Sequence, residues 1–125
     1  MKILIVDDDP DVRGIAAMSL KEIGGMEVAE ACDGADGIAA ARREHPDAIL
    51  LDVTMPDMDG PTALKALRGD ETTAQIPVIF LTARAPKSKN MDLSEMGVAG
   101  ILTKPFSPAE LPQRVRSILR IQERE

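Results

Sequence analysis

The sequence has very few aromatic residues and a single cysteine. Only 2% of its 125 residues are aromatic, with no Trp, no Tyr and two Phe, so Val, Ile, Leu, Ala and Met must build the interior. Cys32 has no second cysteine with which to form an internal disulfide. We therefore expect a reducing compartment, the cytoplasm, and interpret Cys32 as a small packing residue.

Long apolar runs and an excess of positive charge are also absent. The longest apolar stretches, 48–51 and 78–81, are far shorter than the roughly 18 residues that a membrane span needs. The N-terminus lacks the apolar region and cleavage site of a secretory signal. Lys and Arg total 15 against 21 Asp and Glu, a formal net charge of −6. Because phosphate binding requires a basic surface, we predict no direct nucleic-acid partner and no membrane association.

The length and apolar content are typical of one globular domain. A chain of 125 residues with 44% hydrophobic content can bury a sufficient core without a disulfide bond or a structural metal. We find no linker, repeat or low-complexity tract. The sequence therefore predicts a single domain over residues 1–125, with no output domain in this chain.

Short apolar runs separated by helical patterns indicate the fold class. Four runs do not alternate apolar with polar residues, which is typical of strands buried on both faces: 3–6, 48–51, 78–81 and 101–102. A mixed segment, 26–31, is expected to form an edge strand. Helical segments follow each strand, so the order predicts an α/β fold with a parallel sheet covered on both faces by right-handed crossovers.

The first and last helices have the clearest signals. In the first, apolar spacing predicts one inward face, with Asp9 as N-cap, Pro10 at the first position and Gly24 as a left-handed stop. That face comprises Val12, Ile15, Ala16, Ser19, Leu20 and Ile23. In the last, Ser107–Glu110 has capping-box spacing, and Pro112 is expected to delay or tilt the first turn. Its predicted stripe is Leu111, Val115, Ile118 and Gln122.

The middle helices have weaker signals. Gly34 and Gly37 are each expected to cost roughly 1 kcal/mol relative to Ala in the second helix. The segment 86–96 has little periodicity, and we expect it to form the least stable helix.

Polar side chains follow the predicted strands at the points where they end. Asp7, Asp8 and Asp9 follow the first run, and the later strand ends carry Asp52, Thr82 and Lys104. Open α/β sheets bind ligands beyond the carboxyl ends of their strands. Asp9 is explained by helix capping, but the other carboxylates would repel one another without a cation. A hard divalent ion such as Mg²⁺, which takes carboxylate oxygens, is the natural partner.

Four segments, taken together, make the sequence recognisable. Residues 5–9 (IVDDD), 50–60 (LLDVTMPDMDG), 81–83 (LTA) and 102–106 (LTKPF) resemble the receiver domain of bacterial two-component response regulators. The resemblance covers essentially the whole chain. It implies a flavodoxin-like (βα)5 three-layer sandwich whose five-stranded parallel sheet has the order 2-1-3-4-5.

The resemblance also implies roles for the acidic residues. Asp52 would be the phosphoacceptor, whose carboxylate attacks the phosphohistidine of a histidine kinase, and aspartyl phosphates are an established covalent outcome. Asp8 and Asp52 would ligate Mg²⁺, or Mn²⁺ as the alternative ion, with Asp7 acting through a metal-bound water. The backbone carbonyl of Thr54 would be the remaining protein ligand. We interpret Asp57, Asp59 and Gly60 as turn and helix-start residues.

The other strand ends would contact the phosphoryl group. By resemblance, Lys104 neutralises phosphoryl oxygens and Thr82 donates its hydroxyl, while the small Ala83 keeps the site accessible. Thr54 and Arg84 occupy the positions that tune how water reaches the acyl phosphate. The family pattern also favours a cis bond between Lys104 and Pro105.

Ile101 departs from the family pattern. Many receivers have Tyr or Phe three residues before the lysine, and an aliphatic side chain has no polar tip and less reach. Phosphorylation is expected to change the face formed by helix 4, strand 5 and helix 5. With Ile101 there, either this side chain repacks modestly or the signal travels through the backbone after Thr82.

The resemblance implies a switch that catalyses only its own phosphotransfer and autodephosphorylation. Its partners would be a sensor histidine kinase or phosphotransfer protein and a downstream protein. The switch itself would be a monomer or a phosphorylation-dependent dimer. A metal-dependent phosphohydrolase is one alternative. Such an enzyme would use a second acidic residue to protonate the leaving group, but the residue two positions after Asp52 is Thr54. A flavin-binding electron carrier is a second alternative, but this sequence has no Trp or Tyr to stack on a flavin. A constitutive binding module is a third, but such a module would not need the intact phosphoacceptor site that this sequence has.

Overall fold

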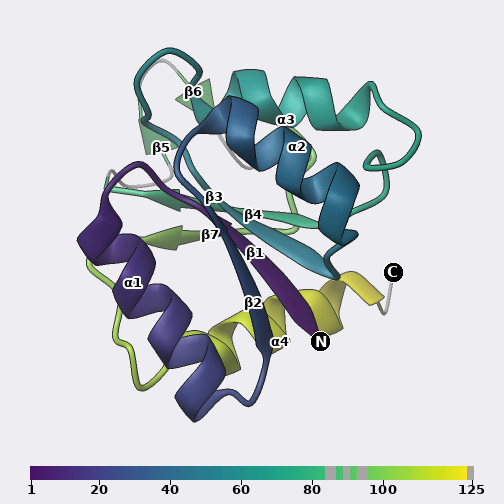
Figure 1. Cartoon of the computed structure of the whole chain (residues 1–125). Helices are drawn as coiled ribbons and strands as arrows, with labels where there is room; N and C mark the ends of the chain where they lie inside the picture. The colour runs from purple at the N-terminus through teal and green to yellow at the C-terminus, as the bar shows by residue number, and fades with distance from the viewer. Residues whose placement is uncertain (84–86, 89–90, 93–95, 124–125) are drawn as a thin grey trace.

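A five-stranded parallel sheet lies between two layers of helices (Figure 1). The computed structural model describes residues 1–83, 87–88, 91–92 and 96–123. The sheet order is β2-β1-β3-β4-β7, and every neighbouring pair is parallel. This confirms the predicted class and the order 2-1-3-4-5, with β2 at one edge. The strands are β1 (Lys2–Val6), β2 (Glu27–Ala31), β3 (Ala48–Asp52), β4 (Val78–Thr82) and β7 (Gly100–Thr103).

The helices cover both faces of the sheet. In Figure 1, α1 and α4 lie on one face and α2 and α3 on the other. Each face has its own buried apolar cluster, with Ile3 and Ile5 of β1 in one and Leu4 and Val6 in the other. Burial on both faces explains why the strand runs do not alternate with polar residues. The helices are α1 (Pro10–Met18), α2 (Gly34–Glu44), α3 (Gly60–Arg68) and α4 (Leu111–Glu123).

A π-helical turn, η1 (Ser19–Ile23), continues α1 and changes which side chains face the core. The N–H of Gly24 donates to the Ser19 carbonyl at 3.2 Å, a step of five residues that rotates the chain relative to an α-helix. Ile23 is 58% exposed, so its predicted inward position is wrong. Ile15 is also 43% exposed, because it lies beside the loop before α4 rather than against the sheet.

The helix ends follow local chemistry with small shifts. The Asp9 side chain accepts from the N–H groups of Asp11 and Val12, which confirms it as the N-cap of α1. The left-handed residue after η1 is Gly25, with φ of 67°, and not Gly24 as predicted. The last helix begins at Leu111, after a turn over 108–110, as expected from a proline at its second position.

The helix predicted over 86–96 is wrong at residues 87–88 and 91–92. Two short strands, β5 (Lys87–Ser88) and β6 (Met91–Asp92), pair there in antiparallel register. The remaining predicted positions at 86, 89–90 and 93–95 lie outside the described residues. Without an apolar stripe to pack on the sheet, the segment has little to stabilise a helix.

The glycines of α2 allow close packing. A Cβ built on Gly37 would lie 2.8 Å from a Val6 methyl carbon, and one on Gly34 would lie 2.7 Å from the Met58 sulfur. The sequence alone suggested that these glycines only weaken the helix. They also allow close packing, because alanine fits at neither position without movement of the buried Val6 or the partly buried Met58.

Gly37→Ala is expected to destabilise the protein although Ala is the better helix former. Overpacking against the buried Val6 outweighs the propensity gain, and we expect a net loss of about 1 kcal/mol in urea unfolding. Ala39→Gly, an exposed position on α2, is the matched control and should also cost about 1 kcal/mol, from propensity alone. A Gly37→Ala protein more stable than wild type would contradict the packing argument.

Among the described residues, no helix combines the length and the apolar character required to cross a bilayer.

Candidate functional site

Three carboxylates meet where β1 and β3 end. These strands are neighbours with Val6 paired to Leu51, so Asp7 and Asp52 follow side by side. One carboxylate oxygen from each of Asp7, Asp8 and Asp52 can be chosen so that the three lie within 4.8 Å of one another. Asp7 is fully buried and Asp52 is 5% exposed, whereas Asp8 is open to solvent. The site is therefore an acidic pocket with two buried carboxylates and one accessible carboxylate.

Lys104 reaches this pocket from the far side of β4. Its Nζ lies 2.7 Å from Asp7 Oδ2 and 3.3 Å from Asp52 Oδ1, and its side chain is 19% exposed. Thr82, at the end of the intervening strand β4, is buried. The Lys104 N–H donates to the Thr82 carbonyl at 2.8 Å, and the Lys104–Pro105 peptide bond is cis, as the resemblance implied.

The pocket has an uneven charge balance. Burial and then the neighbouring charge of Asp7 raise the pKa of Asp52 from 3.8 to about 6, against the opposing effect of Lys104. Burial acts to lower the pKa of Lys104, but hydrogen bonding and attraction to Asp7 and Asp52 outweigh it and raise the pKa. One ammonium group therefore does not fully compensate the carboxylates. Clustered carboxylate oxygens beside solvent are the donor set that Mg²⁺ prefers, so the residues present fit that ion.

The loop after β3 turns directly beneath the pocket. The Thr54 N–H donates to Asp52 Oδ1 at 3.4 Å, and Thr54 itself is exposed. Asp57 has a φ of 67°, and Asp59 caps α3 by accepting from the Thr62 N–H at 2.8 Å. A Cβ on Gly60 would lie 2.7 Å from the Asp52 carbonyl oxygen. Asp57, Asp59 and Gly60 therefore act as turn and helix-start residues, as interpreted from the sequence.

The remaining predicted positions are spread around the pocket. Ala83 is exposed and lies at the rim with Lys104. Ile101 is half-buried and packs against the apolar cluster on the α2 and α3 face. Arg84 lies outside the described residues.

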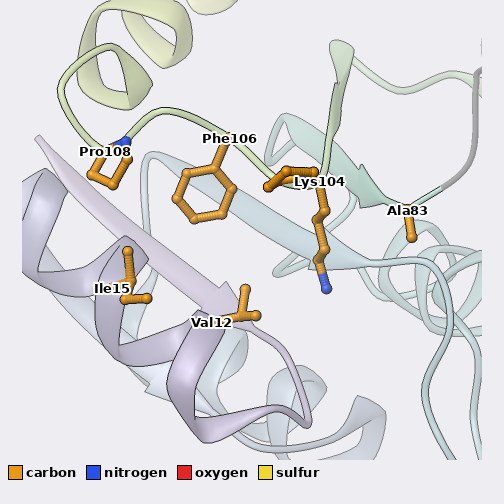
Figure 2. Close-up of a pocket in the computed structure, with 7 residues that line it drawn as sticks. Val12, Ile15, Ala83, Lys104, Phe106 and Pro108 are labelled. Atoms are coloured by element: carbon orange, nitrogen blue, oxygen red, sulfur yellow. The ribbon is translucent and has the colours of Figure 1, made fainter.

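An apolar groove of about 370 Å³ adjoins the pocket. Figure 2 shows the Phe106 ring facing Val12 and Ile15 of α1, with Lys104 at the end of the groove towards Ala83. Pro105 and Pro108 complete the lining. Apart from Lys104 the lining side chains are apolar, so the groove offers a hydrophobic surface next to the acidic pocket.

Sequence reasoning missed two features near the site. Phe106 and Ile15 line the groove, but apolar spacing assigned Ile15 to the core. Arg13 donates from Nη1 to the Asp7 carbonyl at 2.8 Å, and nothing in its spacing distinguishes it from a surface arginine. The groove depends on the packing of α1 against residues distant in sequence, and the Arg13 contact depends on how α1 folds back on the end of β1 six residues earlier.

The chain belongs to the response regulator receiver domain family, whose family model matches residues 3–116. It is 42% identical over 123 residues to the DNA-binding dual master transcriptional regulator RpaA of Synechocystis sp., covering 98% of this chain and 51% of that protein. It is 40% identical over 119 residues to the transcriptional regulatory protein PrrA of Mycobacterium tuberculosis, covering 95% of this chain and 50% of that protein. The chain thus spans about half the length of these curated relatives.

Solved structures agree with this assignment. The chemotaxis response regulator CheY4 of Vibrio cholerae superposes with a TM-score of 0.84 at 33% identity, covering 94% of this chain and 97% of that chain. Receiver domains are phosphorylation-dependent signalling switches of two-component systems. They bind Mg²⁺ at an acidic pocket and interact with histidine kinases or phosphotransfer proteins. The chain is such a switch, and its described part contains an acidic cluster able to bind a metal.

Proposed function

We propose that Asp52 is the phosphoacceptor of this receiver domain. The observation that carries the proposal is its position: a nearly buried carboxylate at the end of β3, with the Lys104 ammonium 3.3 Å from Oδ1 and the accessible Asp8 beside it. A carboxylate oxygen attacks the phosphorus of a phosphohistidine, the P–N bond breaks, and the histidine nitrogen leaves with the electron pair. The product is an acyl phosphate on Asp52.

The surrounding residues stabilise and orient this transfer. Lys104 donates to the incoming phosphoryl oxygens, and the Thr82 hydroxyl at the end of β4 reaches the same group. Because phosphoryl transfer depends mainly on positioning and on charge neutralisation, these contacts lower the barrier without further covalent chemistry. Thr54 and Ala83 at the rim, together with Arg84, control the access of water to the acyl phosphate and hence its lifetime.

We assign the acidic cluster to a divalent cation. Asp8, Asp52 and the Thr54 carbonyl would hold Mg²⁺, or Mn²⁺ in its place, and Asp7 would act through a bound water. When bound, the ion supplies positive charge that offsets the carboxylates and the transferred phosphoryl group. The raised pKa of Asp52 supports this assignment, since a nearby cation favours the ionised nucleophile.

Intact-mass measurement tests the acceptor. Wild-type protein incubated with acetyl phosphate and Mg²⁺ is expected to gain one phosphoryl group, whereas Asp52→Asn protein and metal-free wild type gain none. Addition that persists in Asp52→Asn protein would show that the acceptor is another residue. Hydrolysis of a generic phosphoester that requires Asp52 would instead support a metal-dependent phosphohydrolase.

We propose that the phosphohistidine protein, a sensor kinase or phosphotransfer protein, docks on the groove between α1 and the loop before α4. A donor must bring its phosphohistidine to Asp52, and the apolar groove lies beside that pocket with Lys104 in common. Apolar contact next to the reaction centre would hold the donor in place during transfer.

Ile15→Arg is expected to slow transfer from a phosphohistidine protein by about tenfold, since a charge in an apolar docking groove is poorly accommodated. The rate with acetyl phosphate should stay at the wild-type value, because Ile15 does not contact the acidic cluster. Ile23→Arg is the matched control, since Ile23 is 58% exposed on η1 and is not part of the groove lining. Equal transfer rates for both variants would argue against the groove as the docking surface.

We further propose that phosphorylation changes the face that includes β7 and α4, which then binds a downstream partner or passes the phosphoryl group on. Ile101 of β7 is half-buried against the apolar cluster on the α2 and α3 side of the sheet and would repack modestly when Thr82 moves towards the phosphoryl group. The helix predicted before β7 is not part of this proposal, because its described residues 87–88 and 91–92 form β5 and β6.

A further inference from the structure

Arg13 of α1 links three elements at the edge of the acidic pocket. Its Nη1 donates to the carbonyl oxygen of Asp7 at 2.8 Å, and its Nε lies 3.3 Å from Glu30 Oε1 on β2. The Arg13 side chain is only 20% exposed. A charged side chain held this way joins α1, the end of β1 and the edge strand β2.

The Asp7 residue is held by its neighbours on every polar atom. Its N–H donates to the Ala31 carbonyl at 3.2 Å, while Oδ1 accepts from the Asp9 N–H at 2.9 Å and Oδ2 from Lys104 at 2.7 Å. Arg13 completes the set at the carbonyl. The bonds of Asp9 and Lys104 orient the side chain, whereas the bond from Arg13 acts on the peptide unit that joins Asp7 to Asp8.

That peptide unit determines where the accessible carboxylate points. A peptide is planar, so a hydrogen bond that fixes the Asp7 carbonyl also fixes the N–H and Cα of Asp8. A guanidinium donor to a carbonyl is charge-assisted and stronger than a neutral hydrogen bond. The contact from Glu30 holds the guanidinium plane in turn, which limits the rotation of the donor.

We propose that Arg13 is a positioning residue for divalent-cation binding. It holds the Asp7–Asp8 peptide so that the carboxylates of Asp8 and Asp52 face the same ion. This inference rests on the proposed function, because it takes the acidic cluster to be a cation site. Arg13 contacts neither the phosphoryl group nor the ion, and its effect is transmitted through the backbone of the two aspartates.

The charge of Arg13 and its positioning role predict opposite effects of its removal on divalent-cation affinity, which makes the proposal testable. Arg13 brings a positive charge close to a site for a divalent cation, so removal of that charge should strengthen cation binding by Coulomb attraction. Loss of positioning should weaken it. Mutation of a residue that orients metal ligands without touching the metal typically lowers metal affinity by roughly 10–100-fold. This loss exceeds the gain expected from removing a positive charge, because the charge is screened at a partly solvated site.

The test is the Mg²⁺ affinity of Arg13→Met protein, measured by isothermal titration calorimetry because the chain has no Trp or Tyr. Met keeps a long, helix-compatible stem and removes the donors. We expect Mg²⁺ to bind about tenfold more weakly to this variant than to wild type. Arg42→Met is the matched control, since Arg42 pairs with Asp70 on an exposed surface and should bind Mg²⁺ as wild type does.

Arg13→Lys gives a second reading if the methionine variant is poorly folded, which urea unfolding without Mg²⁺ would reveal. Lys keeps the charge and one donor but lacks the planar fork that contacts Asp7 and Glu30 together, so its affinity should fall between wild type and Arg13→Met. Wild-type or tighter affinity in both Arg13 variants would overturn the inference and leave the proposed function intact. Failure of wild-type protein to bind Mg²⁺ would overturn both.

Discussion

Lys104→Met is expected to destabilise the protein by about 3 kcal/mol near neutral pH in the absence of divalent cations. Its ammonium group is the partner of the fully buried Asp7 at 2.7 Å and lies 3.3 Å from Asp52. Removal of one partner of a buried pair typically costs 3–5 kcal/mol, and the partial exposure of Lys104 favours the lower value. Urea unfolding of the variant and of wild type measures the difference.

The loss in Lys104→Met protein should depend on conditions that neutralise the carboxylates. Added Mg²⁺ supplies positive charge to the same cluster, and lower pH protonates it, so both should reduce the difference from wild type. Lys65→Met, at an exposed position on α3, is the control and should change stability by less than about 0.5 kcal/mol. Equal losses in the two variants would show that the pocket does not depend on its lysine.

Asp52→Asn is expected to stabilise the protein by about 3 kcal/mol near pH 7 without Mg²⁺. The pKa of Asp52 is raised from 3.8 to about 6, first by burial and then by repulsion from Asp7. The folded protein therefore binds a proton more tightly at this site than the unfolded chain does. Asparagine carries no charge at any of these pH values, so it escapes the cost of ionisation, which is about 1.4 kcal/mol for each pKa unit.

The sign of the pH dependence follows from the same shift. Between pH 3.8 and about 6 the folded state holds more protons at Asp52 than the unfolded state, so the contribution of this group to stability falls as pH rises through that window. Unfolding free energies of wild type and Asp52→Asn protein should therefore converge near pH 4 and diverge towards pH 7. Mg²⁺ should stabilise wild type more than the variant.

Asp57→Asn provides the control for this measurement. Asp57 is exposed on the same loop, and asparagine tolerates its positive φ. Near pH 7 its stability should be within about 0.5 kcal/mol of that of wild type, as for other exposed substitutions. A parallel pH profile for wild type and Asp52→Asn protein would contradict the raised pKa of the acceptor.

Local sequence signals predicted most of the sheet. The runs ending at Val6, Leu51 and Leu81 are continuous and apolar, and the structure buries each of them between two layers. The segment 86–96 has no such pattern, and the helix predicted there is wrong at the four paired residues of β5 and β6. Strong periodicity reports burial directly, whereas a weakly patterned segment takes its conformation from its surroundings.

Position along the chain predicted the acidic cluster for a simple reason. Asp7 and Lys104 directly follow β1 and β7, Asp52 is the last residue of β3, and parallel strands end at one edge. Helix faces were harder to predict. The π-turn rotates Ile23 outward, and neither a residue type nor a spacing in the sequence marks that extra residue.

The sequence by itself determined the α/β class, the five strands of the parallel sheet, the cap at Asp9 and the carboxylates, because these depend on residue type and on period along the chain. Tertiary structure alone decided the rest. The groove between Ile15 and Phe106, the need for glycine at Gly37 and the contact of Arg13 with Glu30 arise between segments distant in sequence. Their physical cause is close packing of side chains across elements, which no local pattern specifies.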